Sequence, residues 1–416
     1  MKNYIVERNK KYDYTGQSYA TLYPNLHRYP ATMIPQIGID ILKELNISNG
    51  SMLDPYCGSG SSFVCGLESG IKKMDGFDLN PLAVLIAKAK FTKISNSDID
   101  FAYQELRNNI FEMIKYEKKV KKIKLPEITN IEYWFSESVI TNLSVIKHCI
   151  YEIENKDIQT LFLVPFSETV RECSYTRNNE FKLYRMKHEE VLKFNPDTIS
   201  YYFKKLNDVI QYYKMYYQPK LKKNVSVKIH SEPFQNNSAK YDVVLTSPPY
   251  GDSRTTVAYG QFSALSNEWL GINTARKIDS ILMGGKRVNE IINNGCIAEP
   301  ISKISKVDNK RALEVSSFYY DLAESINNVS KSINKNGKII YIVGNRTVKN
   351  VLLPTDQFIA ETFENNGFKH LITYERALSN KAMPSRNSPT NEAGKTVNTM
   401  LYEYIVICEK LGFPQN

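Results

Sequence analysis

The chain alternates short apolar runs with longer segments in which apolar residues recur at helical spacing. The runs predict strands, which lie at about 52–54, 76–78, 225–230, 241–245, 338–345, 369–375 and 401–408. Helical spacing predicts helices at about 37–46, 81–91 and 313–334. Residues 97–222 are mainly helical in pattern and contain few glycines. The alternation predicts an α/β fold with a mainly helical insertion, preceded by a polar, tyrosine-rich arm at residues 1–26.

The first predicted strand runs directly into a turn with two glycines. The turn reads Asp54-Pro55-Tyr56-Cys57-Gly58-Ser59-Gly60. Gly58 and Gly60 permit backbone angles and a close approach that a Cβ would forbid. About 18 residues later, the second predicted strand ends at Asp78, whose carboxylate is able to accept both hydroxyls of a ribose. The dinucleotide fingerprint is excluded because Phe63 stands at its third glycine position, but a Rossmann-like unit for another ligand stays open.

A second candidate site follows the predicted strand at 241–245. The chain there reads Thr246-Ser247-Pro248-Pro249-Tyr250. The prolines have no backbone N–H, so their carbonyls can face a ligand without competing strand partners. A flat ring with an exocyclic amine suits this segment, since Tyr250 can stack on the ring while Ser247 and the Pro248 carbonyl accept the amine's hydrogens. The plainer interpretation is a strand that ends in a Pro-Pro turn.

Together these motifs resemble those of the DNA amino-methyltransferases, and Ser247-Pro248-Pro249-Tyr250 resembles the catalytic motif of the cytosine-N4 type. The resemblance covers roughly 27–96 and 225–410. It implies a Rossmann-like sheet of seven mostly parallel strands, with the last strand antiparallel between two others. It also implies three parts: an arm with the cofactor-binding half at 1–96, an insertion at 97–222 and a catalytic half at 223–416.

The cofactor that the resemblance implies is S-adenosylmethionine. In the family, a Tyr-Pro-Ala segment packs against the methionine end of this cofactor. The cofactor-binding residues that we expect are Tyr29, Pro30, Asp54, Tyr56, Gly58, Gly60, Asp78, Leu79 and Thr246. Many relatives place an aspartate near the adenine just after the third strand, whereas this chain has Ser231 and Glu232, so the adenine contact is not assigned.

The target is narrowed by the residues around the catalytic motif. Methylation of a pyrimidine ring carbon generally uses a cysteine that follows a proline, and the sequence has no Pro-Cys pair. Ser247 favours cytosine N4 over adenine N6, since adenine-N6 members usually carry Asp or Asn at that position. The alternatives are an adenine-N6 enzyme, an RNA guanine-N2 methyltransferase with a similar tetrapeptide, and a catalytically silent module that binds DNA.

The net charge of +10 and the pI near 9.0 indicate a polyanionic partner, here double-stranded DNA, although a lysine-rich solvated surface gives the same totals. The predicted DNA contacts are Arg171, Arg177, Lys182, Arg185, Arg254, Lys381 and Arg386. The first four lie where cations, aromatics and amides alternate, a mixture that reads bases and holds phosphates but also suits a polar loop. Target reading is assigned to 97–222 or to 252–312, without a choice between them.

The remaining features argue against other classes of protein. The six cysteines show no CxxC pair and no regular spacing to histidine, so neither a metal site nor a disulfide framework is indicated. There is no apolar leader and no run near the ~18 apolar residues of a membrane span. We therefore expect a cytoplasmic protein with no membrane partner. The resemblance allows for a cognate restriction endonuclease, which the sequence does not identify.

Overall fold

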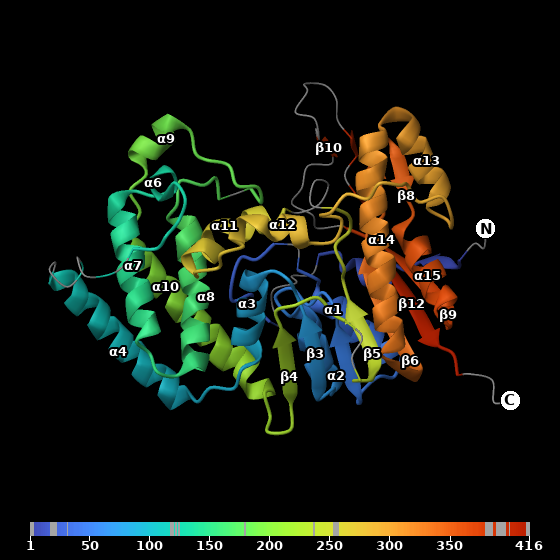
Figure 1. Cartoon of the computed structure of the whole chain (residues 1–416). Coiled ribbons are helices and arrows are strands. Elements are labelled where there is room, and N and C mark those ends of the chain that lie inside the picture. The colour runs from blue at the N-terminus through green and yellow to red at the C-terminus, as the bar shows by residue number, and fades with distance from the viewer. Residues whose placement is uncertain are drawn as a thin grey trace.

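A computed structural model describes residues 4–412 apart from 17–22, 31, 117–119, 121–122, 124, 179, 236–237, 253–257, 379–385, 388–396 and 399. Its centre is an eight-stranded sheet in the order β1-β9-β12-β6-β5-β2-β3-β4 (Figure 1). The strands are β1 (Val6–Arg8), β2 (Ser51–Asp54), β3 (Lys73–Phe77), β4 (Ser226–His230), β5 (Tyr241–Thr246), β6 (Ile333–Val343), β9 (Phe368–Ala377) and β12 (Tyr402–Lys410). Two short hairpins, β7 (Arg346–Val348) with β8 (Val351–Leu353) and β10 (Arg386–Asn387) with β11 (Val397–Asn398), lie outside this sheet.

All neighbouring strands of the sheet are parallel except at β12, which runs antiparallel to both β6 and β9. The α/β fold and the mostly parallel sheet are therefore confirmed. Because parallel strands end at one edge, β2, β3 and β5 carry their carboxyl ends to the same place. The antiparallel β12 brings its first residues, not its last, to that edge.

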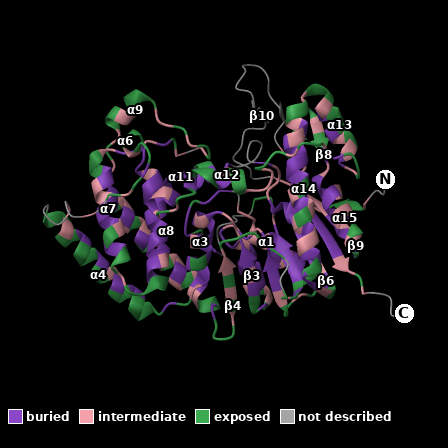
Figure 2. Ribbon diagram, viewed as in Figure 1, coloured by how far each residue is buried: buried purple, intermediate pink, exposed green. Residues whose placement is uncertain are grey.

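Helices cover both faces of the sheet. On one face lie α1 (Pro35–Glu44), α2 (Ser61–Ser69) and α3 (Pro81–Phe91), and on the other α13 (Ala298–Val307), α14 (Asn309–Lys331) and α15 (Thr355–Asn365). Successive residues of β5 serve the two cores in turn: Val243 and Leu245 pack into the first and Val244 into the second. Burial on both faces explains why residues 243–245 of this strand are all apolar, and Figure 2 shows the buried colour at the centre of the sheet.

The segment between β3 and β4 beyond α3 forms a helical block beside the sheet (Figure 1). It comprises α4 (Asn96–Lys115), α6 (Ile131–Trp134), α7 (Glu137–Tyr151), α8 (Lys156–Glu172), α9 (His188–Lys193), α10 (Thr198–Tyr212), η2 (Tyr213–Tyr217) and η3 (Gln218–Lys220). Its buried centre is α8, which packs against α3, α7, α10 and α11 (Tyr259–Trp269). The block is thus joined to the sheet at α3 and to the segment that follows the catalytic motif.

Two expectations from the sequence differ from the structure. The N-terminal arm contributes the eighth strand, because Val6, Glu7 and Arg8 pair with residues 373–375 of β9. All three side chains are exposed, so the pairing rests on the backbone and leaves no apolar pattern to detect. Residues 270–312, for which the sequence analysis gives no helix, contain η4 (Ala275–Lys277), α12 (Ile278–Ile281) and α13. The arm continues into the short helix η1 (Lys10–Asp13).

No helix within the described residues has the length and apolar character needed to cross a membrane.

Candidate active site

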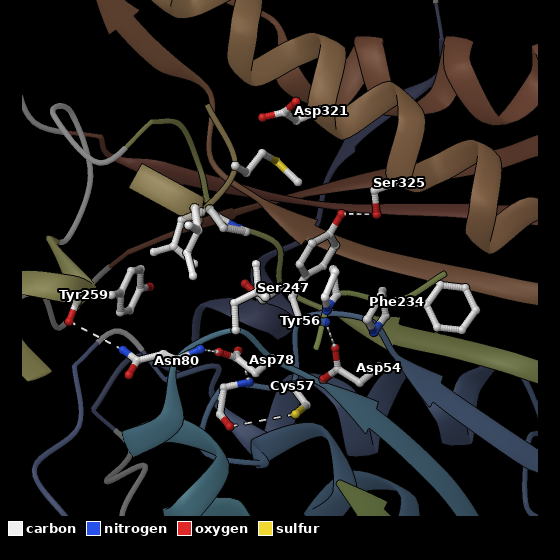
Figure 3. A pocket seen from close by; sticks show the side chains of 18 of the residues that line it. Asp54, Tyr56, Cys57, Asp78, Asn80, Phe234, Ser247, Tyr259, Asp321 and Ser325 are labelled. Atoms are coloured by element: carbon white, nitrogen blue, oxygen red, sulfur yellow. Dashed lines mark hydrogen bonds between the residues drawn. The ribbon is translucent and has the colours of Figure 1, made fainter. Parts of the chain in front are cut away.

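The carboxyl edge of the sheet opens into a cavity of about 520 Å³ (Figure 3). The cavity is lined by the glycine turn after β2, by Asp78 after β3 and by Ser247 and Pro249 after β5. Residues of α14 and of the segment 280–286 form the opposite wall. The two motifs that the sequence singles out, which are separated by about 170 residues, therefore open into one space.

Asp54 is buried at the floor of this cavity and connects its two halves. Its carboxylate accepts hydrogen bonds from Ser62 Oγ, from Thr246 Oγ1 and from the backbone N–H of Tyr56. Burial raises the pKa of Asp54 to about 6, while the bonds from Ser62 and Thr246 favour the carboxylate. Thr246 is fully buried, and its hydroxyl is used in this bond between β5 and the end of β2.

The glycine turn has the backbone that its sequence predicts. Gly58 and Gly60 have φ values of 50° and 85°, in the region where glycine is favoured. A Cβ at Gly58 would meet no described atom within 4 Å, whereas one at Gly60 would lie 2.6 Å from the Phe91 ring. Between them, Ser59 Oγ is buried without a hydrogen-bond partner among the described residues, and its carbonyl accepts from Lys90 Nζ at 2.9 Å.

Asp78 faces the turn from the end of β3. One carboxylate oxygen accepts from the Gly58 N–H at 2.9 Å and the other from the Asn80 N–H at 2.8 Å. These bonds fix the carboxylate and leave its further lone pairs toward the cavity. Burial raises the pKa of Asp78 to about 6, opposed by the backbone hydrogen bonds from Asn80 and Gly58.

Tyr29 closes one end of the cavity. Its ring stacks on Tyr259 of α11, with centroids 6.0 Å apart, and its hydroxyl accepts from Asn80 Nδ2 at 3.1 Å. Pro30 is buried next to it, and Thr32 and Met33 continue the wall. Leu79 and Tyr56 also line the cavity, and the Tyr56 hydroxyl donates to Ser325 of α14. Six of the nine predicted cofactor residues therefore line the cavity, whereas Pro30, Gly60 and Thr246 do not.

Sequence reasoning missed the residues at the other end of the cavity. Pro233, Phe234 and Gln235 line it just beyond β4. Phe234 packs edge-on against Phe77, with centroids 5.0 Å apart, and Phe77 stacks on His230. The acidic residue of this segment, Glu232, lies two positions before the aromatic side chain that stands at the cavity. An apolar residue shortly after a strand was the only signal.

The segment after β5, which the sequence predicts to be catalytic, presents Ser247 to the cavity and holds Tyr250 beside it. Ser247 Oγ donates to Tyr250 Oη at 3.3 Å, and the Tyr250 hydroxyl donates to Glu403 Oε1 at 3.1 Å. Burial, and next the nearby Glu403 carboxylate, raises the pKa of Tyr250 well above its usual value. The hydroxyl therefore keeps its proton. Glu403, from β12, was not among the predicted site residues.

The predicted DNA-binding cations lie in different environments. Arg171 is buried, and its two terminal nitrogens donate to the carbonyls of Phe262 and Glu180, so this side chain is not placed to contact DNA at the surface. Arg185 lies between the rings of Tyr133 and Tyr175, at 4.5 and 5.3 Å from their centroids.

Two of these cations, Arg177 and Lys182, are exposed, and Arg177 forms an ion pair with Glu180. The loop that carries them bonds to α11 through Leu183 N–H and Gln261 Oε1. It therefore lies beside the helix that carries Tyr259. Arg254 and Lys381 lie outside the described residues, and Arg386 is described only as part of β10.

A curated relative decides the family. The Type II methyltransferase M.MvaI of Kocuria varians is 38 % identical to this chain over 432 residues, a match that covers 97 % of this chain and 94 % of the relative. The chain belongs to the Type II DNA methyltransferase family. The expected DNA methyltransferase is thereby confirmed at the level of the family, which implies S-adenosylmethionine as methyl donor and DNA as substrate. The relative's name does not say which base is modified.

No family model matches this methyltransferase. Two solved structures are distant neighbours. A candidate DNA modification methylase of Thermus thermophilus is 19 % identical, with 27 % of this chain and 43 % of that chain covered and a TM-score of 0.18. The rRNA methyltransferase AviRa of Streptomyces viridochromogenes is 10 % identical, with 97 % and 94 % covered and a TM-score of 0.28. Scores this low do not establish a shared fold.

The cavity of this methyltransferase fits its expected cofactor. A ribose requires an acceptor for its two hydroxyls, and Asp78 offers a fixed carboxylate for them. The open side of Gly58 leaves room for a ligand against the turn, where a larger residue would project into it. The Ser59 hydroxyl, which has no hydrogen-bond partner among the described residues, and the aromatic ring of Phe234 offer a polar and a flat contact.

Proposed function

We propose that this methyltransferase transfers a methyl group from S-adenosylmethionine to the N4 amine of a cytosine that is flipped out of double-stranded DNA. The observation that carries the proposal is the single cavity shared by Asp78, the glycine turn and Ser247. A cofactor held by the first two has its reactive end beside the third. Serine at the first catalytic position is what favours cytosine over adenine.

Each residue has a task in this reaction. Asp78 holds the ribose, and the Tyr29 end of the cavity receives the methionine part. Tyr250 stacks on the extruded base, and Ser247 Oγ with the Pro248 carbonyl accepts the hydrogens of the amine. These bonds localise the nitrogen lone pair, which is otherwise delocalised into the ring, and aim it for in-line attack.

Asp78 and the glycine turn would hold a cofactor that would supply an electrophilic sulfonium methyl, and the amine would release one proton to water on gaining that methyl group. The protein makes no covalent bond to the base. The floor around Asp54, the Asp78 carboxylate and the Tyr29–Tyr259 stack keep the site rigid, so alignment rather than acid–base chemistry is their contribution.

DNA contact is proposed for the exposed cations Arg177 and Lys182, whose loop adjoins α11 beside the cavity. Phosphate binding by these side chains would set the position of the duplex without reading its sequence. The proposal leaves Arg185 as a support for that loop, because its guanidinium is held between two tyrosine rings and its Nε donates to Tyr133 O.

The test is incubation of the purified protein with labelled cofactor and, in separate reactions, duplex DNA of mixed sequence or RNA, followed by nucleoside mass analysis. We expect N4-methylcytosine as the product. Formation of N6-methyladenine would refute the assigned base, and label found in RNA alone would refute DNA as the substrate. Ser247→Ala should lower kcat more than it raises KM for DNA, because its bonds strengthen as the amine becomes tetrahedral. Ser305→Ala is the matched control, since the Ser305 hydroxyl donates to Asn309 Oδ1 on an exposed surface.

A further inference from the structure

Glu403 reaches the active site from a strand that is not next to the catalytic one. In the sheet order, β6 lies between β5 and β12. Because β12 is antiparallel, its second residue stands at the edge where β5 ends, and there Glu403 Oε1 accepts from the Tyr250 hydroxyl at 3.1 Å. The Glu403 side chain is only 15 % exposed.

Arg376 fixes the other oxygen of this carboxylate. Arg376 and Glu403 are direct cross-strand partners on β9 and β12, and the guanidinium donates to Glu403 Oε2. Arg376 is 1 % exposed, and its Nε donates to the Tyr12 carbonyl at 2.6 Å. A guanidinium donates and never accepts, so Glu403 is held as an acceptor on both oxygens.

The direction of the remaining bonds follows from this acceptor. The Tyr250 hydroxyl has one proton and gives it to Glu403. Its oxygen is then free to accept the Ser247 proton, and the donor–acceptor distance of 3.3 Å is consistent with that bond. The Ser247 hydroxyl donates its proton to Tyr250, so its oxygen presents only lone pairs to the cavity.

We propose that Glu403, held by Arg376, is a positioning residue that orients the Ser247 hydroxyl as an acceptor for the amine of the target base. This inference rests on the proposed function of Ser247 and deepens it. The alternative orientation would be harmful, because a serine proton donated to the amine nitrogen would occupy the lone pair that attacks the methyl group. The relay Arg376–Glu403–Tyr250–Ser247 excludes that orientation before the base arrives.

The inference predicts how two substitutions combine. Tyr250→Phe keeps the aromatic face but removes the acceptor for the Ser247 proton, and Glu403→Gln places a donating amide group in the relay. Each should lower kcat about tenfold, the effect of one charge-assisted hydrogen bond, with KM for DNA within about twofold. The double variant should have the kcat of Tyr250→Phe alone, because both changes break one chain.

The experiment is a double-mutant cycle on one duplex, with kcat and KM measured for the four proteins. Glu409→Gln is the matched control: it lies on β12 as well, but its ion pair with Lys338, at 3.0 Å, is at the opposite end of the strand. Fluorescence of 2-aminopurine at the target position reports extrusion of the base. Tyr250→Phe should leave that signal at the parental level.

Two results would overturn the inference. One is a double variant whose kcat is reduced by the product of the two single reductions, and the other is a parental kcat for Tyr250→Phe. The second result is informative even if Glu403→Gln is poorly folded, because Tyr250→Phe leaves the buried ion pair intact. Failure of the proposed function looks different. In that case the parental protein makes no N4-methylcytosine, or Ser247→Ala, included in the series, is as active as the parent.

Discussion

Replacing Asp78 by alanine tests the cofactor site most directly. The carboxylate is the only acceptor that we assign to the two ribose hydroxyls, and charge-assisted hydrogen bonds of this kind contribute about 1.5–3 kcal/mol. At 1.4 kcal/mol for each factor of ten, Asp78→Ala should raise the Kd for S-adenosylmethionine roughly 10- to 150-fold. The N–H groups of Gly58 and Asn80 also lose their acceptor, so the true value should lie toward the upper end.

Titration calorimetry measures this change, with Asp75→Ala as the control. Asp75 lies on the same strand, accepts from the Tyr241 hydroxyl at 2.9 Å and is outside the cavity, so its removal should leave Kd unchanged. An unaltered Kd for Asp78→Ala, with a normal thermal unfolding curve, would refute the placement of the ribose.

The same site predicts a pH dependence. The pKa of Asp78 in the free protein is raised to about 6, and only the ionised carboxylate accepts from both hydroxyls. Protonation therefore competes with binding, and affinity for the cofactor should fall as the pH drops through 6. Asp54, whose pKa is also raised to about 6 by burial, lies in the same cavity, so Asp78→Ala should weaken this dependence without abolishing it.

Three further predictions concern other parts of the molecule. Arg177→Ala with Lys182→Ala should weaken DNA binding and lower its salt slope by up to about 1 per lost phosphate contact, with cofactor affinity unchanged in the same titration. Burial lowers the pKa of Lys90 to about 7, so between pH 7 and 10.5 the unfolded chain binds more protons than the folded protein. The free energy of unfolding, measured in urea, should therefore rise with pH in this range. Lys90→Met should remove the part of the rise that is due to Lys90. Gly60→Ala should lower the stability of the protein by about 1–3 kcal/mol and weaken cofactor binding, because φ is 85° and the new Cβ would lie 2.6 Å from the Phe91 ring. Thermal unfolding measures the change in stability.

Much of the sheet could be predicted from the sequence because its central strands are buried on both faces. An apolar run such as 243–245 is typical of a strand covered by helices on either side, and the glycines after β2 have positive φ where the turn was expected. The edge strand β1 could not be found in this way. Its three residues are exposed, and the bonds that hold it are made by backbone groups that every residue carries.

The residues of the candidate site also differ in how far the sequence could predict their position. Asp54, Asp78 and Ser247, which line one cavity, could be predicted to lie together because they stand at the carboxyl ends of strands, where sequence order fixes their place at the edge. Glu403 was missed because it begins a strand, and only the antiparallel direction of β12 brings it to the same edge. Arg171 was placed among surface contacts because its neighbours are polar, and only the packing of α8 against α11 shows that it is buried.

The distance along the chain between neighbouring strands bears on how this enzyme folds. β2 pairs with β5 at Met52 and Val243, and β3 pairs with β4 across the whole helical block. Contacts between residues so far apart in sequence form slowly, since a long loop must close before any pairing is gained. Helical hydrogen bonds join residues four apart, so we expect the helices of the block to form first and to shorten the loop that the sheet has to close. Methyl transfer should therefore appear only in the last phase of refolding, after helical signals are complete, because Asp78 and Ser247 meet only when that loop is closed.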